Sequence, residues 1–442
     1  MALSLPGNPD LERFRRDARR LQRGVRDRDP QALELVARHH PGSVPDELDG
    51  FALTDAQLVL ARSYGFASWP RLRDYLRRSA GLRRDPTTID DTELFDDTEL
   101  FDDTEVDGAG RSERAGVDEG RVARAALALA CLRYDGADDP ARWARASALL
   151  QRHPELPGRD PFVAATVADP SSLRAHLEAD PGAAVRSGGP FEWPPLLYLA
   201  YSRVPQQDPL VSARLLLDAG ADPDSGYLWQ GVPPPFTVLT GVFGEGESGP
   251  GRQPRHPAWR ELALVLLERG ADPNDRQALY NRMFGRDDSH LELLLDHGLG
   301  HPAGEVWADR LGVAAESLEE MMERQLHWAA SHGFAARTAL LAAHGFTTTV
   351  VPVQAAVGVD GLRDGRTALH QAAFMGDLDL IRDLLESGAD PTVVDAQHGT
   401  TAASWAQWAR HDEAEQLLRR AEAEHSRGAR GTAYGSGDSR QG

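Results

Sequence analysis

Hydrophobic positions in the second half of the chain follow a pattern that predicts a helix with an abrupt stop. Leucines and other apolar residues recur three and four positions apart, which places them on one face of a helix. Gly-Ala-Asp-Pro then ends the pattern, with Gly where a helix can close in a left-handed residue and Pro where no helix continues. Three copies occur at residues 213–223, 264–273 and 381–391, with stops at Gly220, Gly270 and Gly388, and residues 291–298 hold a weaker copy.

A second pattern precedes the third copy and predicts the start of another helix. Residues 365–376 read Gly-Arg-Thr-Ala-Leu-His-Gln-Ala-Ala-Phe-Met-Gly. Thr367 is a residue type that caps helix N-termini, and Ala372 and Ala373 are small enough for a neighbouring helix to approach closely. Residues 399–420 look like a degenerate copy of the same unit.

Residues 365–391 closely resemble an ankyrin repeat, whose pattern is Gly-x-Thr-Pro-Leu-His-x-Ala-Ala, a turn, a second helix and Gly-Ala-Asp. The departure from that pattern is Ala368 in place of Pro. The resemblance implies an all-α fold in which helix-turn-helix repeats stack into a solenoid. It also implies that His370, and His327 in the related stretch 326–333, bond to backbone between repeats.

The spacing between the glycine stops is uneven, which indicates that loops interrupt the array. We expect an ankyrin-type array over residues 191–422, and residues 121–190 read as degenerate helical repeats or an N-terminal cap. Insertions of this kind usually lie on one face of a repeat protein, often the binding face. We expect them near residues 242–258, 300–325 and 346–362.

The two ends of the chain differ from the array. Residues 1–80 predict a small helical unit, and residues 53–76 resemble a leader found before the repeats of many bacterial ankyrin proteins, a resemblance that brings no activity with it. Residues 81–120 include repeats of Asp-Asp-Thr-Glu-Leu-Phe. Such charge with low complexity predicts a disordered linker, which is either expanded repeat sequence without a selected role or a short acidic binding segment. We expect residues 423–442 to be a disordered tail.

Charge narrows the class of partner. The formal net charge is −20, and residues 1–86 hold 16 Arg against 12 acidic residues, so the rest of the chain carries about −24. This balance disfavours general binding to nucleic acid or to anionic membranes, and it favours a basic or neutral partner surface. The chain has no Lys beside its abundant Arg, which suggests a GC-rich genome, and the resemblance of residues 53–76 implies a bacterial source.

Other sequence signals give little support to catalysis. The chain lacks a leader with a basic segment followed by an apolar one, so we expect a cytoplasmic protein. It also lacks a run of about 18 apolar residues, so we expect no membrane span. We further expect a monomer. Cys131 is the one cysteine, which excludes an intramolecular disulfide and a Cys-based zinc site, and its apolar surroundings favour a buried structural role. No hydrolase, zinc-protease or P-loop motif occurs, so we expect no cofactor, metal or catalytic residue. An alternative is a toxin-like effector or enzyme with its activity in residues 1–160, in which the repeats serve for targeting.

Two further stretches admit a functional interpretation. Residues 244–249 read Gly-Glu-Gly-Glu-Ser-Gly, which matches a dinucleotide-binding loop. The two glutamates would repel a pyrophosphate, so we interpret the stretch as a flexible insert.

Residues 13–28 hold eight Arg diluted by acidic residues, which favours a solvated helix face. A nucleic-acid adaptor that binds through this helix is the second alternative.

The residues predicted to contact a partner lie in the last two repeats. Phe374 and Met375 occupy positions that face the concave side in the family, and Trp408 takes the matching position one repeat later. Trp405 is better explained as covering the end of the array, and Trp408 fits either role. Interfaces favour aromatic side chains and Arg, so the sequence predicts a protein-interaction scaffold or adaptor, not an enzyme. The turn tips that the resemblance places beside these side chains are Arg363, Asp364, Arg366, Gln397, His398 and Thr400.

Overall fold

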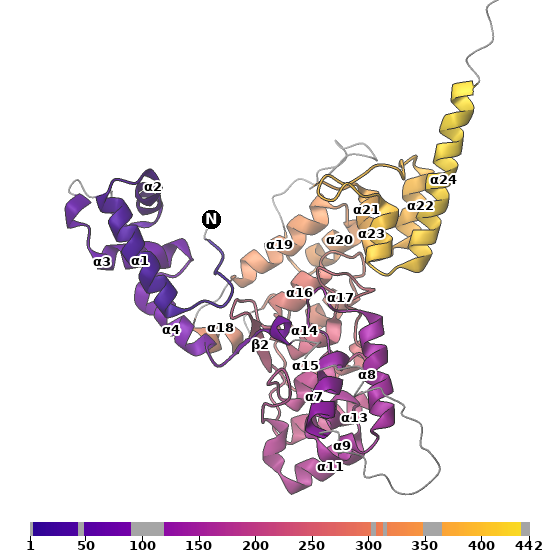
Figure 1. The fold of residues 1–442 in the computed structure, drawn as a ribbon, viewed down its shortest axis with the longest axis horizontal. Coiled ribbons are helices and arrows are strands. Elements are labelled where there is room, and N and C mark those ends of the chain that lie inside the picture. The colour runs from indigo at the N-terminus through magenta and orange to yellow at the C-terminus, as the bar shows by residue number, and fades with distance from the viewer. Residues whose placement is uncertain are drawn as a thin grey trace, which may run out of the picture.

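The protein is mostly helical. The computed structural model describes residues 3–42, 48–89, 119–301, 306–312, 316–347 and 365–434. The acidic hexads and most of the insertion predicted near residues 346–362 lie outside these ranges. The described helices form a small unit at the N-terminus and a longer series of helix pairs (Figure 1).

The N-terminal unit is built around one amphipathic helix. Its α-helices are α1 (Leu11–Arg26), α2 (Pro30–His39), α3 (Leu53–Ser63) and α4 (Trp69–Ser79). Helix α1 buries Phe14, Ala18, Leu21 and Val25, which recur every three or four residues, and packs against α2 and α3. The arginines on its other face are exposed, as expected of a helix at the surface of a domain.

The N-terminal unit is docked on the helix pairs by a small sheet and a shared hydrophobic cluster. Strand β1 (Arg83–Arg84) pairs in parallel with β2 (Gly226–Trp229), and β3 (Phe236–Thr237) pairs with β2 in antiparallel orientation. The hydroxyl of Tyr75 donates a hydrogen bond of 3.0 Å to the carbonyl oxygen of Gly231. The sequence-based boundary is therefore wrong for residues 81–89: the predicted linker begins with a strand that belongs to the sheet.

Part of the predicted insertion near residues 300–325 completes this junction. Helix α18 (Val306–Leu311) contacts α4, and Trp307 and Leu311 are buried in one cluster with Phe66 and Leu72 of the N-terminal unit. The two helices lie side by side where the indigo unit meets the rest of the molecule (Figure 1). The insertion thus holds the N-terminal unit on the array.

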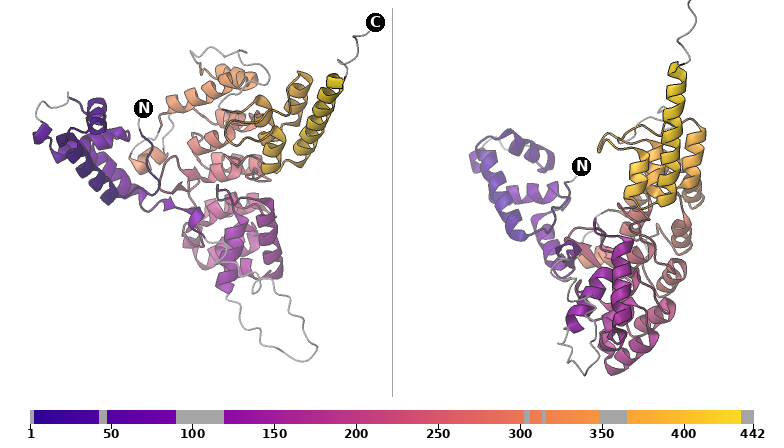
Figure 2. Two further views of the ribbon diagram at one scale, coloured as in Figure 1. Left: turned by 45° about the horizontal axis from the view of Figure 1, so that its top comes forward. Right: turned by 45° about the vertical axis from the view of Figure 1, so that its right-hand side comes forward.

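The helix pairs follow one another along the chain and stack through like helices. Among the pairs, the first helices α10, α12, α14 and α16 contact in succession, as do the second helices α11, α13 and α15. Figure 2 shows this stack from two further directions. The pairs are α7 (Glu119–Ala130) with α8 (Pro140–Arg152), α10 (Pro161–Thr166) with α11 (Pro170–Ala179), α12 (Pro195–Tyr201) with α13 (Pro209–Asp218), α14 (Val238–Phe243) with α15 (Trp259–Glu268), α16 (Arg276–Arg282) with α17 (Ser289–Asp296), α19 (Leu318–Ser331) with α20 (Ala335–Ala343), α21 (Ala368–Met375) with α22 (Leu378–Glu386), and α23 (Ala402–Trp408) with α24 (Asp412–Tyr434).

Local sequence explains where many of these helices begin and end. Asp-Pro dipeptides start four of them, because the Asp side chain accepts the free N–H groups of the first turn and Pro fits its first position; the caps are Asp139, Asp160, Asp169 and Asp208. Gly220, Gly270 and Gly388 close helices with φ values of 94°, 94° and 89°, so the predicted left-handed stops are confirmed.

The prediction of a disordered tail over residues 423–442 places the start of the tail too early. Helix α24 continues to Tyr434, so residues 423–434 are helical. Ala414 and Leu418 bury one face of α24 against the preceding pair, and Arg419 bridges Glu415 and Glu422, each at 3.5 Å, along the exposed face.

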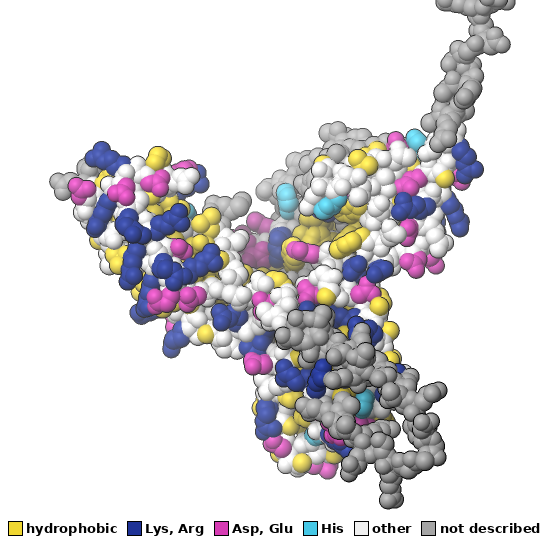
Figure 3. Space-filling model, in the orientation of Figure 1, with side chains coloured by type: hydrophobic (Ala, Val, Ile, Leu, Met, Phe, Trp, Pro, Cys, Tyr) yellow, Lys and Arg dark blue, Asp and Glu magenta, His cyan; other side chains and the backbone are white. Residues whose placement is uncertain are grey.

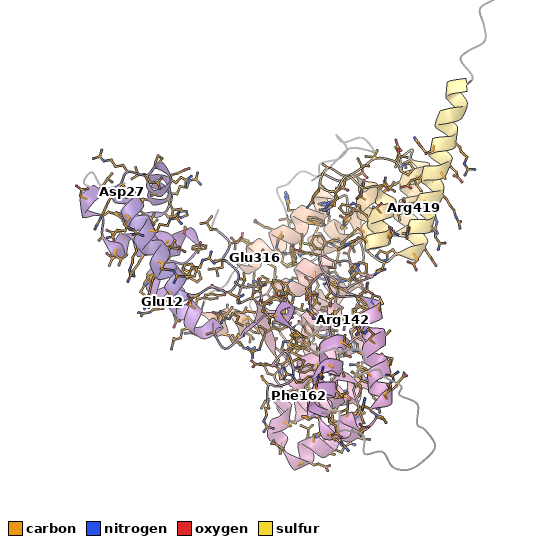
Figure 4. The ribbon with its side chains drawn as sticks, in the orientation of Figure 1. Glu12, Asp27, Arg142, Phe162, Glu316 and Arg419 are labelled. Atoms are coloured by element: carbon orange, nitrogen blue, oxygen red, sulfur yellow. The ribbon has the colours of Figure 1, made fainter. Side chains whose placement is uncertain are left out.

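One buried ion pair fixes the turn between α7 and α8. The Arg142 guanidinium reaches from α8 toward the interior of the array (Figure 4) and donates to Asp138 at 2.9 Å. Asp138 also accepts the backbone N–H groups of Arg133 and Tyr134 at 2.9 and 2.8 Å. Burial raises the pKa of Asp138 above its ordinary value, although Arg142 opposes this shift.

Replacing Asp138 by Ala should lower the free energy of unfolding by about 3–5 kcal/mol, because Arg142 would keep a buried and uncompensated charge. Urea unfolding followed by circular dichroism measures the loss. Asp379→Ala is the matched control, since Asp379 pairs with Arg382 at 2.8 Å but its side chain is 93% exposed. Equal stability of the two variants would show that the buried pair does not fix this turn.

Candidate binding pocket

The first helix of the repeat at 365–391 is fixed at its start by two polar side chains. The Thr367 hydroxyl accepts the backbone N–H of His370 at 3.3 Å and lies 2.7 Å from His370 Nδ1. The other ring nitrogen, Nε2, lies 3.0 Å from the carbonyl oxygen of Thr400 in the next repeat. The prediction that Thr367 caps the helix and that His370 bonds to backbone between repeats is confirmed.

His327 does not play the same part. Helix α19 begins well before it, at a capping box formed by Ser317 and Glu320, so His327 lies in the middle of a helix and is exposed. The Leu-His-x-Ala-Ala match was misleading because no capping residue precedes the histidine at the spacing that Thr367 has from His370.

Asp395 organises the turn that follows α22. Its buried carboxylate accepts the backbone N–H groups of Gln397, His398 and Thr400 at 2.9, 2.6 and 3.0 Å. It also accepts the indole N–H of Trp405 at 3.1 Å, which fixes the position of that ring. Burial alone raises the pKa of Asp395, but these hydrogen bonds outweigh it and hold the pKa well below its ordinary value.

A pocket of about 770 Å³ lies between the last two repeats and the helix pair α16–α17. Its walls are mainly aromatic, with Tyr280 and Phe284 on one side and Phe374, Trp405 and Trp408 on the other. Figure 3 shows hydrophobic side chains gathered in a recess over the C-terminal pairs, flanked by charged and histidine side chains. The remaining lining residues are Glu247, Arg366, Gln371, His398, Thr400, Ser404 and Gln407.

The rings of the pocket support one another. Phe374 stacks on Trp408 with ring centroids 6.0 Å apart and meets Trp405 edge to face at 6.1 Å. On the opposite side, Tyr280 meets Phe284 edge to face at 5.3 Å. Trp408 remains 48% exposed, which is unusual for so large an apolar side chain and leaves much of its surface open to a partner.

The polar side chains that line the pocket differ in their environments. The hydroxyl of Tyr280 donates to the exposed carboxylate of Glu247 at 2.8 Å. Burial, together with this acceptor, raises the pKa of Tyr280 to about 12, so the phenol stays protonated and remains a donor. The Arg366 guanidinium lies 5.8 Å over the Trp405 ring. The Oε1 atom of Gln371 is buried without a hydrogen-bond donor among the described residues.

The loop at residues 244–258 contributes Glu247 to the pocket lining and is packed, so the prediction of a flexible insert was wrong. Gln253 donates to Asp138 at 2.9 Å, and Arg252 donates to the carbonyl oxygen of Trp408 at 2.7 Å. A Cβ at Gly251 would collide with the carbonyl oxygen of Ala409, so glycine is needed for this approach. The loop follows helix α14 and does not have the strand–helix setting of a dinucleotide site.

The structure brings together five of the nine residues predicted to contact a partner: Arg366, Phe374, His398, Thr400 and Trp408 line the pocket. Met375 lies beside it, with its methyl group over Gly285, and Gln397 is exposed at the turn. Arg363 and Asp364 lie outside the described residues. Trp405 does not cover the end of the array as expected, because α24 packs there and Asp395 directs the indole into the pocket wall.

Seven lining residues were missed. Tyr280 and Phe284 are spaced four apart on and after α16, which was a detectable helical pair, but that repeat has no recognisable first motif. Glu247 belongs to the loop that was taken for a flexible insert. The other missed residues are Gln371, Ser404, Trp405 and Gln407.

Cys131 was the remaining candidate for a reactive side chain. Cys131 is fully buried, and burial raises its pKa to about 12, so its thiol is protonated at neutral pH. Within the described ranges, no group of three or more His, Cys, Asp or Glu side chains is arranged to hold a metal ion. No helix in the same ranges has the length and apolar character needed to cross a membrane.

Comparison with known proteins agrees with the geometry of the last repeats. Residues 364–396 match the family model of the ankyrin repeat. The match covers α21, α22 and Asp395, and therefore three of the residues that line the pocket, Arg366, Gln371 and Phe374. The search of curated proteins found no match to the chain.

The His370 contact predicts a pH dependence of stability. Burial lowers the pKa of His370 below its ordinary value of 6.5, because the neutral ring is favoured in the folded state. The contribution of His370 to stability is therefore fully present above pH 6.5, and it is lost as the pH falls through the lowered pKa of the folded state. We expect the melting temperature to fall from about pH 7 to about pH 5, and to fall less in His370→Gln. Identical pH profiles for the two proteins would contradict this role for His370.

Proposed function

We propose that this protein is an ankyrin-type solenoid that binds a segment of another protein in the aromatic pocket between α16 and the last two repeats. The observation that carries the proposal is the pocket itself, which joins rings from separate repeats around a space of about 770 Å³. Its position supports a binding role, because the first helices α16, α21 and α23 line the face that ankyrin proteins use for partners.

The composition of the pocket is that of an interaction hot spot. Trp, Tyr and Arg are over-represented among residues that dominate binding energies, and a few such anchors carry most of the energy. Here Trp408, Trp405, Tyr280 and Arg366 stand around one recess. The rings are held by stacking and by the Asp395 contact, so little conformational entropy is lost when a partner binds.

The proposal is a binding function without a reaction step. A buried Cys131 supports this interpretation, because its protonated thiol is a poor nucleophile at neutral pH. As part of the same proposal we place the protein in the cytoplasm of a bacterium, as a monomer that binds a partner with a basic or neutral surface. The Arg-rich composition supports the bacterial source, and the acidic charge supports the choice of partner.

The experiment is affinity purification with the whole chain, followed by titration calorimetry with the partner that mass spectrometry identifies. The double variant Trp408→Ala with Phe374→Ala should weaken binding by about 2 kcal/mol or more, which is roughly 30-fold in Kd. Leu264→Ala is the control, since Leu264 is 37% exposed on the second helix α15, away from the pocket. Equal affinity of the wild type and the double variant would refute the proposed site.

A further inference from the structure

We propose that the aromatic pocket receives a basic side chain, Arg or Lys, from the partner, with Glu247 as its counter-charge. This inference rests on the proposed function and deepens it, because it names the chemistry that the pocket selects. Three independent features of the described residues carry it: an unneutralised carboxylate, aromatic faces that already attract guanidinium groups, and a buried acceptor without a donor.

The Glu247 carboxylate is available to a cation. It is exposed beside the pocket and accepts the hydroxyl hydrogen of Tyr280 at 2.8 Å, and no described Arg or His lies within ion-pair distance of it. The neighbouring Glu245 differs, since it is buried and forms ion pairs with Arg282 and Arg255. Of these two glutamates, therefore, one fixes the loop and the other faces the pocket with its charge uncompensated.

The rings around the pocket already hold cations of this chain. The guanidinium of Arg252 lies 5.0 Å over Trp408, that of Arg324 lies 5.6 Å over Tyr280, and that of Arg366 lies 5.8 Å over Trp405. These distances are within the range in which the negative face of an aromatic ring attracts a cation. The arrangement shows that the walls suit a guanidinium group.

These three arginines are not equally fixed. Arg252 donates to the carbonyl oxygen of Trp408, and Arg324 donates to both carboxylate oxygens of Glu316 at 2.8 Å each. Arg366 pairs with no carboxylate among the described residues and itself lines the pocket. We interpret Arg366 as a stand-in, which occupies the Trp405 face until a partner's basic side chain takes its place.

The third feature is a hydrogen-bond acceptor in need of a donor. The Oε1 atom of Gln371 is buried at the pocket and has no donor among the described residues, while its Nε2 atom donates to the carbonyl oxygen of Phe284 at 3.5 Å. A buried acceptor without a partner is costly. A guanidinium or ammonium group supplies N–H donors and carries the charge that Glu247 requires.

Other occupants fit these groups less well. An acidic side chain would pair with Arg366 but would bring a negative charge toward Glu247 and offer no donor to Gln371. An apolar side chain would remove water from the exposed Glu247 carboxylate without replacing it, which costs free energy, and would leave Gln371 Oε1 without a donor. The charge of about −24 on the chain after Pro86 also attracts a basic partner segment.

The test uses a phage-displayed library of random peptides selected on the full-length protein, so the probe is a peptide of known sequence. The best peptide is synthesised, and its Kd is measured for the wild type, Glu247→Gln, Arg366→Gln and Trp408→Ala by fluorescence anisotropy. We expect selected peptides to share a basic residue, Glu247→Gln to weaken binding by about 10-fold, and Arg366→Gln to tighten it by about 3-fold. Replacing the peptide's Arg by neutral citrulline, or its Lys by norleucine, should abolish the effect of Glu247→Gln.

Opposite signs, with tighter binding to Glu247→Gln and weaker binding to Arg366→Gln, would overturn the inference and indicate an acidic occupant. An unchanged Kd for both Glu247→Gln and Arg366→Gln would also overturn the inference and would indicate an apolar occupant. In either case loss of binding in Trp408→Ala would keep the proposed function intact. Binding that is insensitive to Trp408→Ala, or failure to select any peptide, would instead count against the proposed function. Melting curves of each variant confirm that it is folded.

Discussion

The contacts of the loop at residues 244–258 join both walls of the pocket to the first helix pair. Buried Glu245 pairs with Arg282 at the end of α16, and Gln253 donates to buried Asp138 beside the first helix pair. From the same loop, Arg252 reaches the carbonyl oxygen of Trp408 in the last repeat. A buried charge is costly when its partner is absent. Movement of the loop would therefore destabilise the fold, because it would separate buried groups such as Glu245 and Arg282 from each other.

This constraint explains why the pocket is a property of the whole array and not of one repeat. Helix pairs that stack in series normally contact their neighbours alone. Here the loop connects the first helix pair to the last, and Arg410 completes the connection with Asp139 at 2.8 Å. The rings of Tyr280 and Phe284 are therefore held opposite those of Phe374 and Trp408, although nearly a hundred residues of chain separate the two walls. The N-terminal unit is attached elsewhere, through the sheet and α18, and leaves the pocket open.

The sequence predicted features that short stretches of chain determine, and it failed where distant stretches meet. The stops at Gly220 and Gly388, the Thr367 cap and the His370 contact each follow from a few neighbouring residues. Trp405 was misread because its orientation depends on Asp395 in the preceding turn. Glu247 was missed because Gly-rich composition suggested mobility, whereas those glycines permit close approach to the last repeat. Two of the five aromatic rings, those of Tyr280 and Phe284, lie on the helix pair α16–α17, outside the residues that match the ankyrin repeat, so family resemblance did not point to them.

The most direct test of the central claim is a crystal structure of the chain bound to a captured partner segment. The account predicts that the segment lies in the pocket, in contact with both Phe284 and Trp408, with a basic side chain beside Glu247. A segment bound on the N-terminal unit, with the pocket empty, would contradict it.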